Sequence, residues 1–199
     1  PLGRDSQASL ARWLALAGSV LGFLVTLPLY TGFQAGTAQM QFVEKAPWIE
    51  RFNIYYHLGV DGISLWFVLL TAFITIIVVI AGWEVIQKKV NQYMAAFLIL
   101  SGLMIGVFAA LDGLLFYVFF EATLISMYLI IGVWGGPNRI YAAFKFFLYT
   151  LMGSLLTLVA FQIAVWIPRR CHGNPLTNPI MLAVIIVVGL LKLTGVEYQ

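Results

Sequence analysis

Charged side chains are scarce in this chain of 199 residues, of which 10% are Asp, Glu, Lys or Arg and 62% are hydrophobic. A soluble domain carries about 25% charged residues, and these cover the apolar core that it buries. The mean hydropathy of +0.96 shows that this chain lacks the polar residues for such a surface. The composition excludes a water-soluble enzyme and an intrinsically disordered chain, and it predicts a protein that folds in lipid.

Cysteine is also scarce, and Cys171 is the one cysteine of the chain. A disulfide framework and a multi-cysteine iron–sulfur site are therefore excluded within this chain. The adjacent His172 and the distant His57 lack the further ligands that a metal ion needs, so we expect no metal site. The chain has no dinucleotide-binding fingerprint and no phosphate-binding loop, so we expect no cofactor bound to it. A net charge of +3 is too small an excess to indicate nucleic-acid binding.

What the chain does have is long apolar runs. About 20 apolar residues cross the ~30 Å hydrocarbon layer as a helix. The runs are continuous rather than alternating, which favours helices over barrel strands. The sequence therefore predicts an all-α, polytopic transmembrane helix bundle of five or six helices. The expected spans are Trp13–Tyr30, the stretch between Asp61 and Glu84, the stretch between Lys89 and Asp112, Gly113–Trp134 and Asn138–Ile167, and Pro179–Leu191 could add a short sixth.

The basic residues of the connections indicate an orientation, because Lys and Arg accumulate in cytoplasmic loops. Five of them are expected on one side and two on the other, or four if the last span forms. We therefore place the Arg4 end in the cytoplasm. The two sets are Arg4, Arg12, Lys88, Lys89 and Arg139 on the first side, and Lys45 and Arg51, joined by Arg169 and Arg170, on the second.

Two short-range patterns concern the ends and faces of these spans. Thr31–Val60 is expected to be a long polar and aromatic connection, and Asp61 is expected to cap the helix that follows it. Glycines four residues apart, at Gly18 and Gly22 and again at Gly102 and Gly106, are typical of helices that pack closely.

Two ionisable residues lie inside predicted spans. Glu121 lies eight residues past Gly113, about 12 Å into its helix, and Lys145 lies seven residues past Asn138, about 10 Å in from the other face. A charge at mid-membrane costs at least ~2.5–3.5 kcal/mol on insertion scales, so such residues usually face the bundle interior and are functional. The structural alternative is that Glu121 and Lys145 pair only to hold two helices together.

Tyrosines accompany both charges at helical spacing. Tyr117 and Tyr128 share the helix face of Glu121, while Tyr141 and Tyr149 flank Lys145. If the two helices are antiparallel neighbours, about 8 Å of depth separates the two charges, so water would have to link them. A carboxylate whose proton affinity depends on the distance of a cation is the simplest element of a proton relay.

Two segments, FNIYYHLGVDGISLWFVLLTAFITIIVVIAGW and LDGLLFYVFFEATLISMYLIIGVWGGPNRIYAAFKFFLYTLMGS, carry a family resemblance. The chain resembles the M subunit (mitochondrial ND4-like) family of NADH:quinone oxidoreductase, respiratory complex I, from about Arg4 to Ala160. Members are antiporter-like, fourteen-helix, proton-translocating subunits of the membrane arm. The resemblance implies that this chain corresponds to the second to sixth helices.

The resemblance also implies roles for individual residues. The glutamate of the fifth helix, essential for pumping in the family, falls on Glu121, the basic residue early in the sixth helix on Lys145, and a supporting aspartate on Asp112. It implies other membrane-arm subunits of the complex as partners. It also implies that NADH, FMN, iron–sulfur clusters and quinone are bound in partner subunits and not by this chain. It further implies proton translocation across the bacterial inner membrane, with the Arg4 end again cytoplasmic.

The sequence departs from the family pattern at two places. Ser126 stands where the family usually has proline, which predicts a straighter helix. Residues 161–199 do not resemble the family's continuation, and the surroundings of Lys192 do not match those of the family's downstream lysine. We therefore predict an antiporter-like domain over residues 1–160 and a divergent tail over residues 161–199, produced by a frameshift, a splice or divergence. Because the chain begins at Pro1, we expect a fragment or a processed product.

Two alternatives to the respiratory subunit stay open. Multisubunit cation/proton antiporters use the same fold and the same buried acid. A fragment that serves assembly alone, or has no function, is the second alternative.

Overall fold

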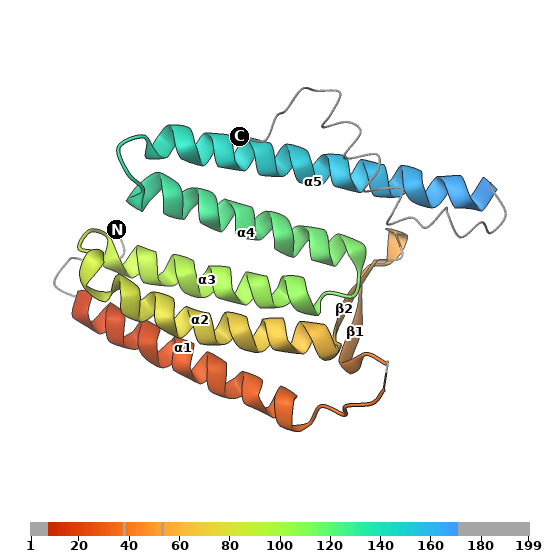
Figure 1. Ribbon diagram of the computed structural model, residues 1–199, viewed down its shortest axis with the longest axis horizontal. Coiled ribbons are helices and arrows are strands. Elements are labelled where there is room, and N and C mark those ends of the chain that lie inside the picture. The colour runs from red at the N-terminus through yellow and green to blue at the C-terminus, as the bar shows by residue number, and fades with distance from the viewer. Residues whose placement is uncertain (1–7, 38, 53, 171–199) are drawn as a thin grey trace. The chain divides into compact units, whose positions relative to one another are not determined.

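The computed structural model describes residues 8–37, 39–52 and 54–170 (Figure 1). It falls into two compact units, Pro1–Ala143 and Phe144–Gln199. In the described residues, five α-helices are joined by short connections and one two-stranded sheet. The elements are α1 (Ala8–Thr31), β1 (Gln41–Ile49), η2 (Glu50–Phe52), β2 (Ile54–Val60), α2 (Gly62–Val85), α3 (Val90–Ala109), α4 (Gly113–Trp134) and α5 (Arg139–Arg170).

The helices coincide with the five apolar runs. Helices α1 to α4 are each long and apolar enough to cross a membrane, and α5 begins one residue into the fifth run. The predicted multi-pass helical membrane protein is therefore confirmed. Pro179–Leu191, together with Cys171, His172 and Lys192, lies outside the described residues.

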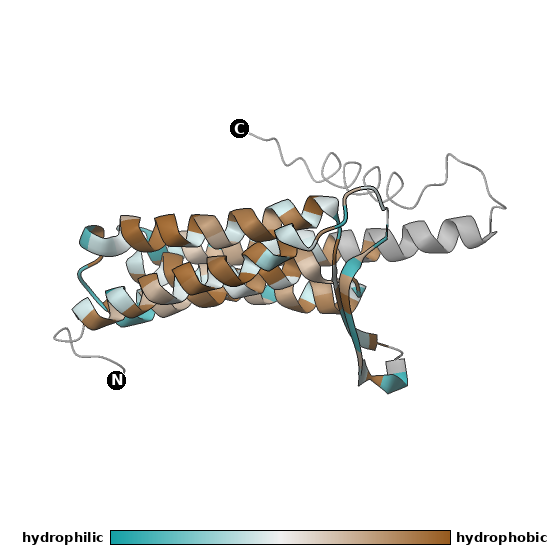
Figure 2. Cartoon of the chain, turned by 90° about the horizontal axis from the view of Figure 1, so that it is seen from below, coloured by the Kyte–Doolittle hydropathy of each residue, from teal (hydrophilic) through white to brown (hydrophobic). Residues whose placement is uncertain are grey.

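In the first unit, the four helices run antiparallel to their sequence neighbours. One end, where α2 and α4 begin, carries the β-strands, and we call it the hairpin end. At the opposite end, which we call the loop end, residues 86–89 join α2 to α3. Polar residues gather at these two ends and apolar residues cover the helices between them (Figure 2), as a bilayer requires.

The core of this unit lies where α1, α2 and α3 meet. Ala15, Val79, Val90 and Met94 form one buried cluster, with Val79 0% exposed. Gly106 of α3 faces the ring of Phe119 on α4 so closely that a Cβ at this glycine would lie 2.7 Å from two ring carbons. The glycine spacing around Gly106 thus marks a close helix approach, as the sequence predicts. Gly22 and Gly102 have nothing within 4 Å of such a Cβ, so their pattern has no such consequence.

Hydroxyl groups link α2 to α3 inside the apolar bundle. The Thr75 and Ser101 hydroxyl oxygens lie 2.6 Å apart, and Thr75 Oγ1 also lies 2.7 Å from the Thr71 carbonyl of its own helix. Thr71 in turn donates to the Phe67 carbonyl at 2.7 Å. Thr75 therefore joins two helices, whereas Thr71 bonds within one.

We expect a double-mutant cycle of Thr75→Val and Ser101→Ala to give a coupling energy of about 0.5–2 kcal/mol, the range for hydrogen bonds between membrane helices. Thr71→Val is the matched control, because Thr71 is equally buried but bonds only within α2, and it should show no coupling with Ser101→Ala. Unfolding of the purified chain in mixed detergent measures both. A Thr75–Ser101 coupling no larger than the control's would contradict the prediction.

Two aspartates begin the helices at the hairpin end. Asp61 Oδ1 accepts from the backbone N–H groups of Ile63 at 3.0 Å and Ser64 at 2.6 Å, and the Ser64 hydroxyl accepts from the Asp61 N–H at 2.9 Å. This reciprocal pair is a capping box. Asp112 Oδ1 likewise accepts from Leu114 N at 2.9 Å and Leu115 N at 3.2 Å and caps α4. The predicted cap at Asp61 is confirmed.

Asp61→Ala is expected to lower the stability of the chain by about 1 kcal/mol at neutral pH, because the N–H groups that begin α2 lose their acceptor. The backbone N–H and then the hydroxyl of Ser64 hold the pKa of Asp61 below its ordinary value. The cap is therefore at full strength above the unfolded-state pKa and is lost as the pH falls through the lower folded-state pKa. The difference in Tm between the variant and the parent should be constant above about pH 5 and shrink below about pH 4. A pH-independent difference would show that the charge of Asp61 does not contribute.

The connection Thr31–Val60 contains an antiparallel β-hairpin, which the sequence analysis did not predict. Lys45 lies opposite His57 and Ala46 opposite Tyr56, with shifts of register at either end of β1. Strand β2 also bonds to the α3–α4 connection: Leu111 N donates to the His57 carbonyl at 2.8 Å, and Leu58 bridges Ala110. The hairpin is thus fastened to the helices beside the start of α4.

Candidate functional site

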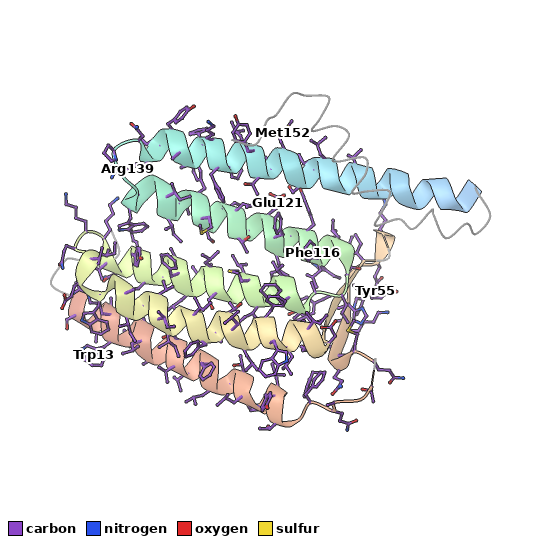
Figure 3. The ribbon with its side chains drawn as sticks, in the orientation of Figure 1. Trp13, Tyr55, Phe116, Glu121, Arg139 and Met152 are labelled. Atoms are coloured by element: carbon purple, nitrogen blue, oxygen red, sulfur yellow. The ribbon has the colours of Figure 1, made fainter. Side chains whose placement is uncertain are left out.

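Glu121 lies in the middle part of α4, with its side chain half-buried. It is about 12 Å along the axis from Gly113, because α4 is a continuous helix from Gly113 to Trp134. Glu121 is also two residues past Phe119, or about 200° around the helix at about 100° per residue. Since Phe119 rests on Gly106 of α3, Glu121 lies on the side of α4 that is turned away from α3 (Figure 3).

The start of α5 packs on that same side of α4. Gly132 lies eleven residues past Glu121 and hence within about 20° of it around the axis. A Cβ at Gly132 would lie 3.8 Å from the Cβ of Ala143, and Ala143 is 1% exposed. The face of α4 that carries the glutamate is therefore the face that the first residues of α5 cover.

The two predicted tyrosines share this face. On a continuous helix Tyr117 lies about 40° and Tyr128 about 20° from Glu121 around the axis, and both are half-buried. Three polar side chains thus form one stripe on an apolar helix. A phenol can donate and accept a hydrogen bond, so the stripe can stabilise either protonation state of a carboxyl group.

Lys145 belongs to the second unit, where it is an exposed residue of α5. Its Nζ lies 5.7 Å from the centroid of the Tyr149 ring, within the range of a cation–π interaction. Tyr141, one turn earlier, is exposed as well. The structure thus groups Lys145 with one predicted tyrosine, while the pairing of Lys145 with Glu121 stays a prediction.

Asp112 is placed at the beginning of α4, where its carboxylate caps the helix. It is nine residues, or about 14 Å along the axis, from Glu121, so the two carboxylates do not touch. The cap at Asp112 was missed by the sequence analysis. The signal was present, because Asp112–Gly113 repeats the Asp61–Gly62 pair that begins α2.

Ser126 is buried and α4 runs through it without interruption. Within the residues that the structure describes, no three His, Cys, Asp or Glu side chains lie close enough to hold a metal ion. The site therefore consists of a half-buried acid among tyrosines on a continuous membrane helix.

Comparison with known families matches almost the whole described chain. Residues 17–110 match the family model for the amino terminus of NADH-ubiquinone oxidoreductase chain 4. Residues 110–172 match the transmembrane family model of NADH:quinone oxidoreductase and Mrp antiporters. A model for the LrgB-like family matches residues 157–199 and so overlaps the end of the second match.

Individual relatives point the same way. NADH-quinone oxidoreductase subunit M of Rhodobacter capsulatus is 57% identical over 150 residues, which cover 75% of this chain and 29% of that protein. Chain 4 of NADH-ubiquinone oxidoreductase of Arabidopsis thaliana is 48% identical over 163 residues, which cover 81% of this chain and 33% of that one. A chain of respiratory complex I from Thermus thermophilus with bound NADH aligns with a TM-score of 0.65 and 32% identity over 82% of this chain and 34% of its own length.

Residues 17–172 thus match the antiporter-like family of NADH:quinone oxidoreductase membrane subunits. Within that class, this part of the chain is homologous to subunit M, called chain 4 in mitochondria. The resemblance inferred from the sequence is confirmed. The chain spans about a third of the length of these relatives.

Proposed function

We propose that this chain is the N-terminal part of a proton-translocating membrane subunit of NADH:quinone oxidoreductase. The observation that carries the proposal is Glu121, a half-buried acid about 12 Å inside α4, within the segment that matches the antiporter family model. A charged group at that depth is costly, so the acids that are found there are usually functional. The tyrosines on its face supply hydrogen-bonding partners along the helix.

In this mechanism Glu121 takes up a proton from one side of the membrane and releases it when a cation approaches. Lys145, which lies six residues past the start of α5, is the basic residue that we assign to this role. The lysine that the family carries further downstream has no match in this sequence. Asp112 supports the relay from the start of α4. Electron transfer from NADH to quinone, with FMN and iron–sulfur clusters, takes place in partner subunits of the membrane complex, so this chain contributes no redox step of its own.

We place this subunit in the bacterial inner membrane with the loop end, where α1 begins, in the cytoplasm. Among the described residues of the first unit, basic groups exceed acidic groups at the loop end, and the reverse holds at the hairpin end, which agrees with the positive-inside rule. The loop end carries Arg12, Lys88, Lys89 and Arg139 with Glu84, and the hairpin end carries Lys45 and Arg51 with Glu44, Glu50, Asp61 and Asp112.

A native gel of source membranes, stained for NADH dehydrogenase activity, tests the proposal. Peptides from the active band are then sequenced, and we expect to find Leu111–Arg139 among them. Recovery of these peptides only from bands without that activity would contradict the proposal.

The second candidate is a subunit of a cation/proton antiporter, since the matching family model covers Mrp antiporters too. Sodium-dependent proton movement in membrane vesicles without NADH would favour it over the respiratory subunit.

A further inference from the structure

The loop end of the first unit has a compact group of basic residues around the connection between α2 and α3. Lys88 and Lys89 lie in this connection with exposed side chains. Arg12 of α1 reaches the same connection, where its Nη2 donates to the Ile86 carbonyl at 3.0 Å. Glu84 is the one acidic residue among the described residues of this end, so the group keeps a net positive charge.

The backbone of this connection is held from two sides. Arg12 bonds to it from α1, and the indole Nε1 of Trp134 on α4 donates to the Lys88 carbonyl at 2.9 Å. The two lysine side chains therefore project from a fixed support rather than from a free loop. Less backbone conformational entropy of the connection would therefore be lost when an anion binds to the lysines.

The guanidinium of Arg12 has an unused donor. Its Nε atom is buried and has no hydrogen-bond partner, although arginine presents its N–H groups in a planar fork that suits a phosphate group. Burial without a partner is unfavourable for a charged donor. A turn of the Arg12 side chain towards a phosphate at the surface would give Nε an acceptor and remove that cost. The phosphate would also neutralise the charge of the neighbouring lysines.

A tryptophan indicates the depth at which the basic residues Arg12, Lys88 and Lys89 lie in the membrane. Trp13, next to Arg12, is 61% exposed on the outer side of α1 (Figure 3) and packs edge-on against Trp83 with ring centroids 5.2 Å apart. Tryptophan gathers at the level of the lipid head groups. Beyond Trp13 along α1 the exposed residues are apolar, among them Leu14, Leu21 and Val25. A lipid whose phosphate lies at Arg12 thus finds an apolar surface for its acyl chains.

We propose that Arg12, Lys88 and Lys89 form a binding site for the head group of an anionic phospholipid. Anionic lipids carry the phosphate that the arginine fork and the two ammonium groups would recognise, without the opposing choline or ethanolamine charge. The site lies at the loop end and involves none of the residues of the proton relay. It therefore stands whether or not the chain translocates protons.

The test measures lipid selectivity of the 199-residue chain reconstituted in phosphatidylcholine vesicles. Trace spin-labelled phosphatidylglycerol or spin-labelled phosphatidylcholine, labelled on the acyl chain, reports by electron paramagnetic resonance how much lipid is held at the protein. We expect phosphatidylglycerol to associate at least about threefold more strongly, and high salt to reduce this ratio.

Two variants locate the site. Lys88→Gln/Lys89→Gln changes only exposed side chains and should lose most of the selectivity, and adding Arg12→Gln should remove the rest. The matched control is Lys45→Gln/Arg51→Gln, which removes two basic charges at the hairpin end and should keep the selectivity of the parent chain.

Four outcomes would overturn the proposal. The first is equal association of the two lipids with the parent chain, and the second is an unchanged ratio in Lys88→Gln/Lys89→Gln. The third is an equal loss in the control variant, which would indicate a response to net charge rather than a site. If excess inorganic phosphate abolishes the selectivity at constant ionic strength, the site binds free phosphate, and the lipid assignment is wrong.

Discussion

Replacing Glu121 with glutamine is expected to reduce NADH-driven proton translocation by at least about tenfold, because a positioned acid–base group typically contributes a factor of 10²–10⁴. Glutamine keeps the volume of the side chain and its capacity for hydrogen bonds but cannot carry a proton. The measurement is acidification of inverted membrane vesicles on addition of NADH, followed with a pH-sensitive dye, in cells whose chromosomal copy carries the variant. Electron transfer to an artificial acceptor should change little, since no redox group is expected in this chain.

Glu84→Gln is the matched control, because Glu84 is an exposed glutamate at the end of α2 and should leave translocation unchanged. The native gel distinguishes two results that would contradict a role of Glu121 in the proton relay. A missing complex would indicate that Glu121 serves helix assembly. An assembled complex with full translocation would show that the proton relay does not pass through Glu121.

Gly106→Ala is expected to lower the stability of the first unit. The added Cβ would meet Phe119 Cδ1 and Cε1 at 2.7 Å and Cγ at 2.9 Å, so the ring or the helix must move. Such overpacking costs about 1–3 kcal/mol. Unfolding of the purified chain in mixed detergent measures the change. Because Phe119 is a neighbour of Glu121 in sequence, a shift of α4 would also displace the glutamate.

Gly102→Ala is the control one turn earlier on α3, with nothing within 4 Å of the added atom. There alanine should be neutral or stabilising by about 0.5–1 kcal/mol, because it restricts the unfolded chain and favours the helix. Phe119→Leu, combined with Gly106→Ala, should recover part of the loss by making room. Equal effects of the two glycine substitutions would show that α3 and α4 do not approach each other at Gly106.

The helices could be predicted from the sequence because charged residues bound the apolar runs. Asp61, Lys89 and Asp112 each stand immediately outside a helix that the structure contains. The hairpin could not be predicted in this way. Besides its pairing with β1, strand β2 is held by the hydrogen bond between Leu111 and His57, which joins segments separated by two membrane helices. Pro47 within β1 also weakens any local strand pattern.

The candidate site was predictable to the extent that it depends on a single helix. The depth of Glu121 and the stripe with Tyr117 and Tyr128 follow from helical periodicity alone. By contrast, the close contact of Gly106 with Phe119, which fixes the side of α4 that faces α3, depends on how two helices pack. The distance between Glu121 and Lys145 depends on the packing of further elements, so no periodicity within either helix determines it.

The bond between His57 and Leu111 also constrains the order of events during biosynthesis. Strand β2 leaves the ribosome before α2 and α3, but its partner at Leu111 follows α3. With the loop end in the cytoplasm, as we propose, the strand reaches the far side of the membrane before α2 and α3 are inserted, and its partner arrives there only after α3 has crossed the membrane. The β2 contact therefore forms only when the third helix has the correct topology, and a chain with α3 wrongly inserted would leave this strand edge unprotected, open to membrane quality-control proteases.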